Sequence, residues 1–186
     1  MRSESNQHNK IIFSGTVGAG KSTAIATLSD IVPVSTEAIA TDATARMKKT
    51  TTVAMDYGLL ILPSGEKVML YGTPGQERFS FMWEILAEGG IGLILLINNG
   101  SPDPLRQLEK YLGAFKNFIA DTAVAIGITH MDRSSAFGLE DYRKKVAMLG
   151  YPAMPAIFRV DARRRADVAM LVKALLYTLN PGLVET

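Results

Sequence analysis

The sequence predicts an α/β fold in which six strands form a mostly parallel sheet, with one antiparallel edge strand and helices on both faces. Short apolar runs alternate with segments of helical spacing along the chain, which is the order expected of parallel strands joined by helical crossovers. The run 91–97 is apolar throughout, as in a strand that is buried on both faces. The turn Pro63-Ser64-Gly65 is too short to join parallel strands, so the strands that flank it are expected to be antiparallel neighbours.

Each element in the first half of the chain follows from a local pattern. The apolar run at 11–14 predicts a strand, and the segment 21–30, which ends close to a proline, predicts a helix. Residues 34–49 are polar and rich in threonine, alanine and charge, so we expect them to be irregular. Residues with strand character predict strands at 52–62 and 68–71, on either side of the short turn.

The second half of the chain continues the alternation. Residues 77–88 predict a helix, which the pair Gly89-Gly90 ends. Residues 104–120 predict a helix because apolar side chains lie on one stripe, at Leu105, Leu108, Leu112, Phe115 and Ile119. The remaining expected elements are strands at 91–97, 123–129 and 156–160, and helices at 138–149 and 166–179.

Composition limits the classes of protein to consider. We expect one domain over residues 1–186, with 1–9 as a tail. The net charge of +2 is too small to indicate a nucleic-acid partner, and the absence of cysteine excludes disulfides and thiolate metal sites. The longest apolar run is far too short to span a membrane, so we expect no integral membrane segment and a cytoplasmic protein.

A glycine-rich loop lies between the first expected strand and the first expected helix. Residues 15–23 read Gly-Thr-Val-Gly-Ala-Gly-Lys-Ser-Thr, which is the G-x-x-x-x-G-K-S/T pattern of a P-loop. Backbone N–H groups of such a loop, together with the N-terminal end of the following helix, bind a polyphosphate. Lys21 can reach the outer phosphates, and the Ser22 hydroxyl can bind Mg²⁺. The residues predicted to bind phosphate are Gly15, Gly18, Ala19, Gly20, Lys21, Ser22 and Thr23.

A second loop follows the expected strand 68–71. Gly75 can offer its backbone N–H to a terminal phosphate, and Gln76 can orient a water for in-line attack on it. The alternative interpretation is a plain turn with a surface glutamine. We therefore predict Lys21 and Gln76 as catalytic residues.

The segment Gly72-Thr73-Pro74-Gly75-Gln76-Glu77 resembles the second switch of the Ras-like small GTPases, which reads D-T-A-G-Q-E. It is more similar to the T-V-P-G-Q of the bacterial MglA-type (Srprb-like) branch. The resemblance extends from about residue 10 to residue 179 and implies a P-loop NTPase fold. It also implies that Gly75 senses the γ-phosphate and that Gln76 positions the hydrolytic water.

The resemblance fails at Gly72, where most of the superfamily has an aspartate near Mg²⁺. We hypothesise that Asp56, on the neighbouring antiparallel strand, reaches the metal through water instead; the alternative is that Asp56 is a surface residue. The resemblance implies a switch threonine near the start of that strand, where Thr52 fits best and Thr51 is the second choice. The predicted metal-binding residues are thus Ser22, Thr52 and Asp56.

Two further loops match the base-reading loops of the same superfamily in part. Thr129-His130-Met131-Asp132 stands where family members read N/T-K-x-D, and Asp161-Ala162-Arg163 stands where they read S-A-K. The resemblance implies that Asp132 accepts hydrogen bonds from guanine and that the Ala162 N–H contacts guanine O6. His130 replaces a lysine and can stack on the base. The predicted base contacts are Thr129, His130, Asp132 and Ala162.

These features predict a small GTPase that binds GTP and GDP with Mg²⁺, acts as a molecular switch and hydrolyses GTP slowly, at about 10⁻⁴ per second. The resemblance implies that the switch acts in bacterial signalling, polarity or motility. The resemblance implies a roadblock-type (MglB-like) regulator or GTPase-activating partner and an effector protein. Two alternatives stay open: a P-loop kinase of a small metabolite, and a nucleotide-binding scaffold with little hydrolysis. The aromatic-rich stretch Phe79, Phe81, Met82 and Trp83 fits either core packing or a partner surface.

Overall fold

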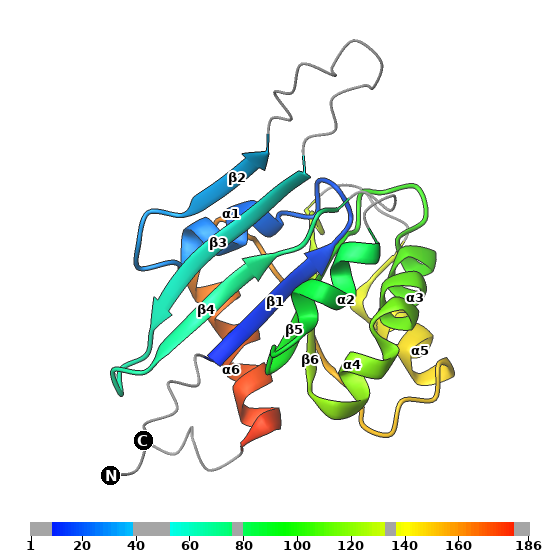
Figure 1. Cartoon of the computed structure of the whole chain (residues 1–186). Coiled ribbons are helices and arrows are strands. Elements are labelled where there is room, and N and C mark those ends of the chain that lie inside the picture. Colours follow the sequence, from blue (N-terminus) through cyan, green and yellow to red (C-terminus); the bar gives the residue numbers. More distant parts are fainter. Residues whose placement is uncertain (1–8, 39–52, 76–79, 133–136, 181–186) are drawn as a thin grey trace.

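The computed structural model describes residues 9–38, 53–75, 80–132 and 137–180. Within these residues seven strands form one sheet, in the order β2-β3-β4-β1-β5-β6-β7 (Figure 1). The strands are β1 (Asn9–Gly15), β2 (Val34–Ala38), β3 (Val53–Ile61), β4 (Lys67–Gly72), β5 (Gly92–Asn98), β6 (Val124–Thr129) and β7 (Ala156–Arg159). The helices are α1 (Lys21–Leu28), α2 (Phe81–Ala87), α3 (Pro104–Ala114), α4 (Lys116–Asp121), α5 (Leu139–Met148) and α6 (Arg165–Leu179).

Only β3 runs against the other strands of the sheet, so the expected α/β fold class, mostly parallel with one antiparallel strand, is confirmed. The sheet differs from the expectation at its edge. β2 pairs along the outer side of β3, from Val34 opposite Tyr57 to Ala38 opposite Val53, so the sheet has seven strands and β3 is second from the edge. The expectation that residues 34–38 are irregular is therefore wrong. Their sequence has no apolar alternation; the outer backbone groups of β3 need hydrogen-bond partners, and β2 supplies them.

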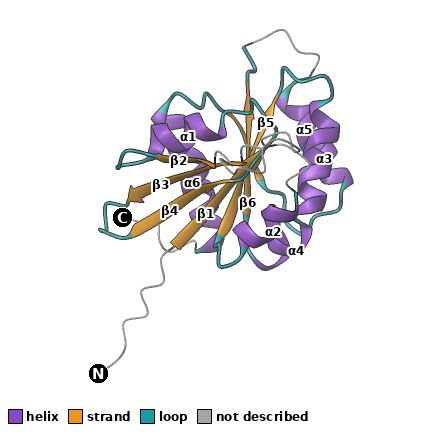
Figure 2. Cartoon of the chain, turned by 45° about the horizontal axis from the view of Figure 1, so that its top comes forward, coloured by secondary structure: helices purple, strands orange, loops and turns teal. Residues whose placement is uncertain are grey.

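The sheet separates two apolar layers, with helices on both sides of it (Figure 2). Successive side chains of a strand point to opposite faces. Ile11 and Phe13 of β1 accordingly pack with α1 and α6, whereas Ile12 packs with the layer that includes α3 and α5. All three side chains are fully buried, so β1 lies at the centre of the molecule and holds the loop that follows it rigidly.

The helix expected over 104–120 is two helices. α3 ends at Ala114, and Phe115 has φ −96° and ψ 12°, which bends the chain before α4 begins at Lys116. The stripe that predicted the helix is real, because Leu108, Leu112, Phe115 and Ile119 are all buried. α2 begins at Phe81; residues 76–79, the start of the helix expected at 77–88, lie outside the described residues. Of the expected tail 1–9, Asn9 is instead the first residue of β1.

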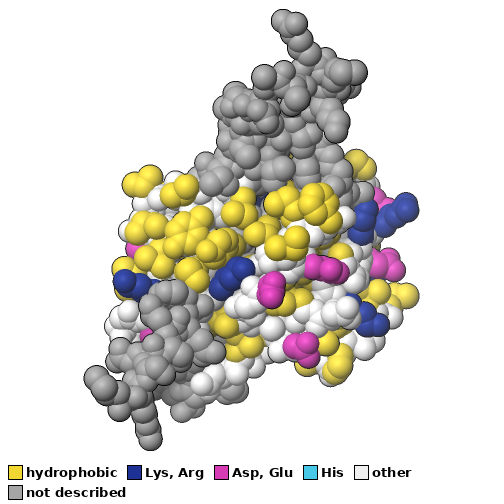
Figure 3. Space-filling model, in the orientation of Figure 1, with side chains coloured by type: hydrophobic (Ala, Val, Ile, Leu, Met, Phe, Trp, Pro, Cys, Tyr) yellow, Lys and Arg dark blue, Asp and Glu magenta, His cyan; other side chains and the backbone are white. Residues whose placement is uncertain are grey.

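One face of β3 and β4 lies against α1, while in the described part of the chain no helix covers the other face (Figure 1). Apolar side chains gather on this uncovered side of the molecule (Figure 3). Tyr57 and Tyr71 are cross-strand partners there, with ring centroids 5.2 Å apart, and Leu59 is opposite Met69. These four side chains are half-buried, because neighbours on the same face shield one another.

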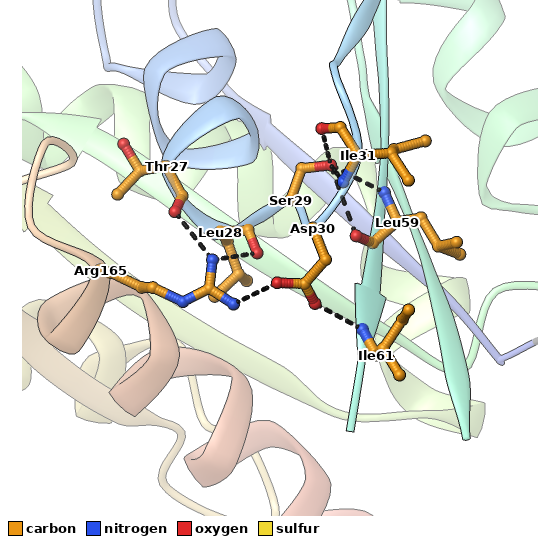
Figure 4. Close-up of polar contacts among 8 residues, drawn as sticks. All are labelled: Thr27, Leu28, Ser29, Asp30, Ile31, Leu59, Ile61 and Arg165. Carbon is orange, nitrogen blue, oxygen red and sulfur yellow. Dashed lines mark hydrogen bonds and ion pairs between the residues drawn. The ribbon is translucent and has the colours of Figure 1, made fainter. Parts of the chain in front are cut away.

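A polar network joins the C-terminal end of α1 to α6 and to β3 (Figure 4). The Arg165 guanidinium donates to the carbonyls of Thr27 and Leu28 and to Asp30, and the other oxygen of Asp30 accepts from the Ile61 N–H at 2.8 Å. The N–H of Ile61 is also the main reason that the pKa of Asp30 is lowered. Arg165 is the first residue of α6, and its side chain is 49 % exposed. Its side chain satisfies carbonyls that the end of α1 leaves unpaired.

Four loops follow the carboxyl ends of parallel strands and therefore meet at one edge of the sheet. They follow β1, β4, β6 and β7, and they contain the glycine-rich loop, the Gly75 turn and the two predicted base-reading loops. None of the helices in the described ranges has the length and apolar character needed to cross a bilayer.

Candidate functional site

The glycine-rich loop joins the central strand β1 to α1. Gly15, Gly18 and Gly20 all have positive φ, and the Ala19 N–H donates to the Thr16 carbonyl across the loop. Gly15 also lies so close to β5 that a Cβ there would be 2.0 Å from the Leu96 carbonyl oxygen. The loop therefore has the backbone conformation that glycine alone adopts freely, and it ends at the N-terminus of α1, where backbone N–H groups are unpaired.

Lys21 is the first residue of α1 and only 8 % exposed. Its amino group donates to the carbonyls of Gly15 at 2.7 Å and Thr16 at 2.8 Å. Burial lowers the pKa of Lys21 to about 8, although the nearby charge of Asp56 partly opposes this. An ammonium held under the loop in this way is a ready partner for a phosphate, since an anion beside it would offset the cost of burying its charge.

The Gly75 turn lies directly against the glycine-rich loop. Thr73 is attached to β1 by its backbone N–H, which donates to the Phe13 carbonyl, and by a 2.8 Å hydrogen bond between its hydroxyl and that of Ser14. Two residues later, a Cβ at Gly75 would be 2.7 Å from the Lys21 amino nitrogen and 2.8 Å from the Val17 backbone nitrogen. Gly75 is thus in contact with two donors of the loop. Gln76 lies outside the described residues.

Ser22 and Asp56 meet beside this turn, since the Ser22 hydroxyl donates to an Asp56 carboxylate oxygen. Asp56 is the register partner of Gly72, and a Cβ at Gly72 would be 3.2 Å from the Asp56 Cβ and 3.3 Å from one carboxylate oxygen. Glycine at position 72 therefore leaves the space that the Asp56 side chain occupies. The described residues contain no group of three or more acidic, histidine or cysteine side chains that could hold a metal by themselves.

A hydroxyl and a carboxylate suit Mg²⁺, which typically binds one or two carboxylates, waters and substrate phosphates rather than a full protein cage. The residues present thus fit Mg²⁺ in company with a bound polyphosphate. Thr52, the third predicted metal residue, lies outside the described residues.

Beside the glycine-rich loop lies an open hollow of about 830 Å³, between that loop and the loops after β6 and β7. Thr129 is buried at its inner side, and its hydroxyl lies 3.1 Å from the Ala19 carbonyl and 3.2 Å from the Ile97 carbonyl. His130 has φ 58°, and its Nδ1 lies 3.0 Å from the Thr129 hydroxyl oxygen. Asp132 is exposed at the rim. The structure therefore brings these three predicted base contacts to one cavity with the phosphate-binding loop.

The loop after β7 forms the opposite wall of the hollow. The Ala162 methyl carbon is 2.9 Å from where a Cβ of Gly20 would lie, so glycine at position 20 allows the two loops to touch. The Arg163 guanidinium donates two hydrogen bonds to the carboxylate of Asp161, which raise the pKa of Arg163; the charge of Asp132 adds to this effect. Three charged residues that sequence reasoning did not select also line the hollow: Arg159, Arg164 and Asp167. Only their position at or after the end of β7, the last strand, pointed to them.

The aromatic residues before and within α2 differ in their exposure to solvent. Trp83 is 3 % exposed, with its indole N–H donating to the Pro74 carbonyl at 2.9 Å, whereas Phe81 is 65 % exposed. Core packing is therefore the correct interpretation for Trp83. Phe79 lies outside the described residues.

Residues 13–154 match the model of a protein family described as "conserved hypothetical ATP binding protein". The chain belongs to this family. The match covers the glycine-rich loop, the Gly75 turn and the loop after β6, so the site described above lies mostly within the family's own region. A search of curated proteins finds no significant match.

Among solved structures, the chain is similar to the crystal structure of the bacterial selenocysteine-specific elongation factor EF-Sec, with a TM-score of 0.64 and 20 % sequence identity. The alignment covers 93 % of this chain and 29 % of that one, so the chain spans less than a third of the elongation factor's length. At this identity the likeness shows the fold alone. The family and the fold together show a nucleotide-binding P-loop NTPase. They do not separate Ras-like small GTPases from other P-loop NTPases, so that resemblance stays a prediction.

Proposed function

We propose that this protein is a Mg²⁺-dependent GTPase that acts as a switch between GTP-bound and GDP-bound states. The observation that carries the proposal is the contact of Gly75 with the Lys21 amino group and the Val17 backbone nitrogen. A phosphate-binding loop alone holds a diphosphate and a triphosphate in similar ways. A second segment that touches the donors of the outer phosphate gives the protein a means to tell the two apart.

Hydrolysis in this proposal is a direct attack of water on the terminal phosphate. Gln76, the residue after Gly75, orients the water, while Lys21 and the backbone N–H groups of the loop stabilise the charge on the transferred group. Bound Mg²⁺ would supply positive charge that offsets the negative charge developing on the transferred phosphoryl group. The Ser22 hydroxyl and Thr52, which precedes β3 in the sequence, would hold the ion, and Asp56 would help to hold it through water. Without an arginine supplied in cis, turnover is expected to be slow, about 10⁻⁴ per second.

Asp56→Ala is expected to weaken Mg²⁺-dependent nucleotide binding by about 10- to 100-fold, because outer ligands of metal sites contribute by that amount. Titration of nucleotide affinity against Mg²⁺ concentration measures the effect, and affinity in excess EDTA should be unchanged. The matched control is Asp121→Ala, which removes an exposed carboxylate at the end of α4. An Mg²⁺ dependence equal to that of the wild type would show that Asp56 has no part in metal binding.

The base assigned is guanine. Asp132, at the rim of the hollow, is the acceptor for guanine N1 and N2, and the backbone of Ala162 is the donor for O6. The charge of Asp132 acts weakly on Arg163, whose guanidinium is hydrogen-bonded to Asp161. ATP is the second candidate, because the family's own description names it.

Competition between GTP and ATP for a fluorescent nucleotide tests the base. We expect the wild type to prefer GTP by about 100-fold or more, and Asp132→Asn to lose most of that preference, because a mismatched polar edge leaves buried groups unpaired. Equal competition by ATP would favour the second candidate.

In single-turnover assays of GTP hydrolysis, Gln76→Leu should be slower than the wild type by about tenfold or more. Equal rates for wild type and variant would remove the role of Gln76 and favour the scaffold alternative.

The resemblance to MglA-type GTPases also suggests a cellular role, which we add to the proposal. A switch of this kind works with a regulator of the roadblock (MglB-like) type or another GTPase-activating partner, and with an effector protein, in the cytoplasm. A P-loop kinase would instead need an acceptor pocket beside the terminal phosphate, and the Gly75 turn is what lies against the loop there.

A further inference from the structure

We propose that Trp83 and Tyr111 are positioning residues that hold the Pro74–Gly75 turn against the phosphate-binding loop and couple the terminal phosphate to helices α2 and α3. The proposal rests on the proposed function in one respect, the role of Gly75 beside the terminal phosphate. It does not depend on which base the protein binds.

Trp83 holds the first of two successive carbonyls. It lies in α2, and its indole N–H donates to the Pro74 carbonyl at 2.9 Å in a buried setting. A buried indole N–H that loses its acceptor is costly, so Trp83 and the turn are expected to move together. The position of α2 is thereby tied to the position of Pro74.

Tyr111 holds the second carbonyl. It comes from α3, and its hydroxyl donates to the Gly75 carbonyl at 3.2 Å. Its ring stacks on that of Trp83, with centroids 4.6 Å apart and an angle of 24° between the planes, and the Phe115 ring also stacks with Trp83, at 5.7 Å. The two hydrogen bonds therefore come from one stacked aromatic cluster that joins α2 to α3.

The opposite side of the turn faces the phosphate site. A Cβ at Gly75 would already be 2.7 Å from the Lys21 amino nitrogen, so the gap between turn and loop holds no group as large as a methyl. Phosphate oxygens that bind Lys21 must shift or reorient the Gly75 peptide. Thr73 is anchored to β1, so the change is concentrated at Pro74 and Gly75, whose carbonyls Trp83 and Tyr111 hold.

Trp83 is the only tryptophan of the chain, so its fluorescence reports on the cluster. We expect the wild type to emit differently with GTPγS and Mg²⁺ than with GDP and Mg²⁺. In Tyr111→Phe, which keeps the stacked ring and loses the hydroxyl, that difference should be largely lost. Single-turnover hydrolysis should fall by about tenfold, the value of one hydrogen bond, while GDP affinity stays within twofold of the wild type. A variant that merely loosened the fold would weaken GDP binding as well.

The matched control is Tyr151→Phe. The Tyr151 hydroxyl also donates to a backbone carbonyl of α3, that of Leu112 at 3.0 Å, but it does not touch the turn. This variant should keep the emission difference and the hydrolysis rate. Trp83→Phe lacks the fluorescent residue, so its nucleotide affinity and hydrolysis rate are measured instead. Like Tyr111→Phe, it should bind GDP as the wild type does and hydrolyse GTP more slowly.

Wild-type hydrolysis and a full emission difference in Tyr111→Phe would overturn the proposal, as would identical emission of the wild type with triphosphate and diphosphate bound. The same measurements with ATPγS and ADP test the role of the cluster even if the protein binds adenine rather than guanine nucleotides. If the wild type binds GTP without hydrolysing it, the proposed GTPase activity fails, while the emission difference still decides the role of the cluster.

Discussion

Lys21→Met is expected to abolish nucleotide binding, with a loss of affinity of about 100-fold or more, because it removes the one charge buried in the phosphate-binding loop. Methionine keeps the length and apolar stem of lysine. At pH 7 the empty protein should therefore unfold with a free energy within about 1 kcal/mol of the wild type, since a costly buried charge disappears together with its hydrogen bonds. Isothermal titration with GTP and GDP measures the loss, and chemical denaturation of the empty protein measures stability.

Lys144→Met is the control for this substitution, because Lys144 is exposed on α5 and away from the site. Its nucleotide affinity should equal that of the wild type. If Lys21→Met bound GTP as tightly as the wild type does, the phosphates would have to lie elsewhere.

The buried position of Lys21 also gives a pH dependence with a defined sign. Its pKa is about 8 in the empty fold and 10.5 as the ordinary value. Between these two pH values the unfolded chain holds a proton that the folded chain has lost. Stability of the empty protein therefore rises with pH across this window, by up to about 3 kcal/mol, and Lys21→Met should remove that rise. Nucleotide binding changes in the opposite sense, because the phosphates need the ammonium form, so affinity should fall as pH increases above 8.

Gly15→Ala is expected to reduce the free energy of unfolding by more than about 4 kcal/mol, or to prevent folding. Gly15 has φ 138°, and a Cβ there would lie 2.0 Å from the Leu96 carbonyl oxygen. Gly15 and Leu96 are register partners on the adjacent strands β1 and β5, so relief of the clash requires separation of the two central strands. Backbone strain at this φ adds to the cost. Denaturant unfolding, or the yield of folded protein, measures the effect.

Two other glycines serve as controls for Gly15→Ala. Gly65 has φ 86° with no atom near a new Cβ, so Gly65→Ala should cost only about 1 kcal/mol of backbone strain. Gly113 lies in α3 with open space around it, so Gly113→Ala should stabilise the protein by up to about 1 kcal/mol. A loss below about 1 kcal/mol for Gly15→Ala would mean that the loop is far softer than its contacts indicate.

Much of the fold could be predicted because its signals are local. The apolar runs that became β1, β5 and β6 lie within two residues of their expected positions, since strands buried on both faces need continuous apolar sequence. β2 was missed because its five residues carry no such signal; they form a strand only when β3 lies beside them. The bend at Phe115 was missed for a related reason. The apolar stripe continues through it, and the packing of both helices on the sheet, rather than the pattern, decides where the axis turns.

Some residues of the candidate site were likewise predicted from the sequence, and others were not. Thr129, His130, Asp132 and Ala162 were selected by resemblance, and the structure places all four around one hollow with the phosphate-binding loop. Arg159, Arg164 and Asp167 were not selected, because charged residues at a strand end or near a helix start are usually solvated and nothing in their spacing distinguishes them. The role of Trp83 had two open interpretations, and its hydrogen bond to Pro74 decides for the core.

The sequence by itself determined the phosphate-binding loop, because strand, loop and helix are contiguous there and each residue type is required by the local backbone. Tertiary structure alone decided which groups surround it. Asp56 lies in the space left open at Gly72 because β3 and β4 pair in that register, and Tyr111 reaches Gly75 because α3 packs beside α2. Asp56 is 16 positions from Gly72 in the chain, and Tyr111 is 36 positions from Gly75. Such contacts depend on strand register and helix packing, which no local pattern specifies.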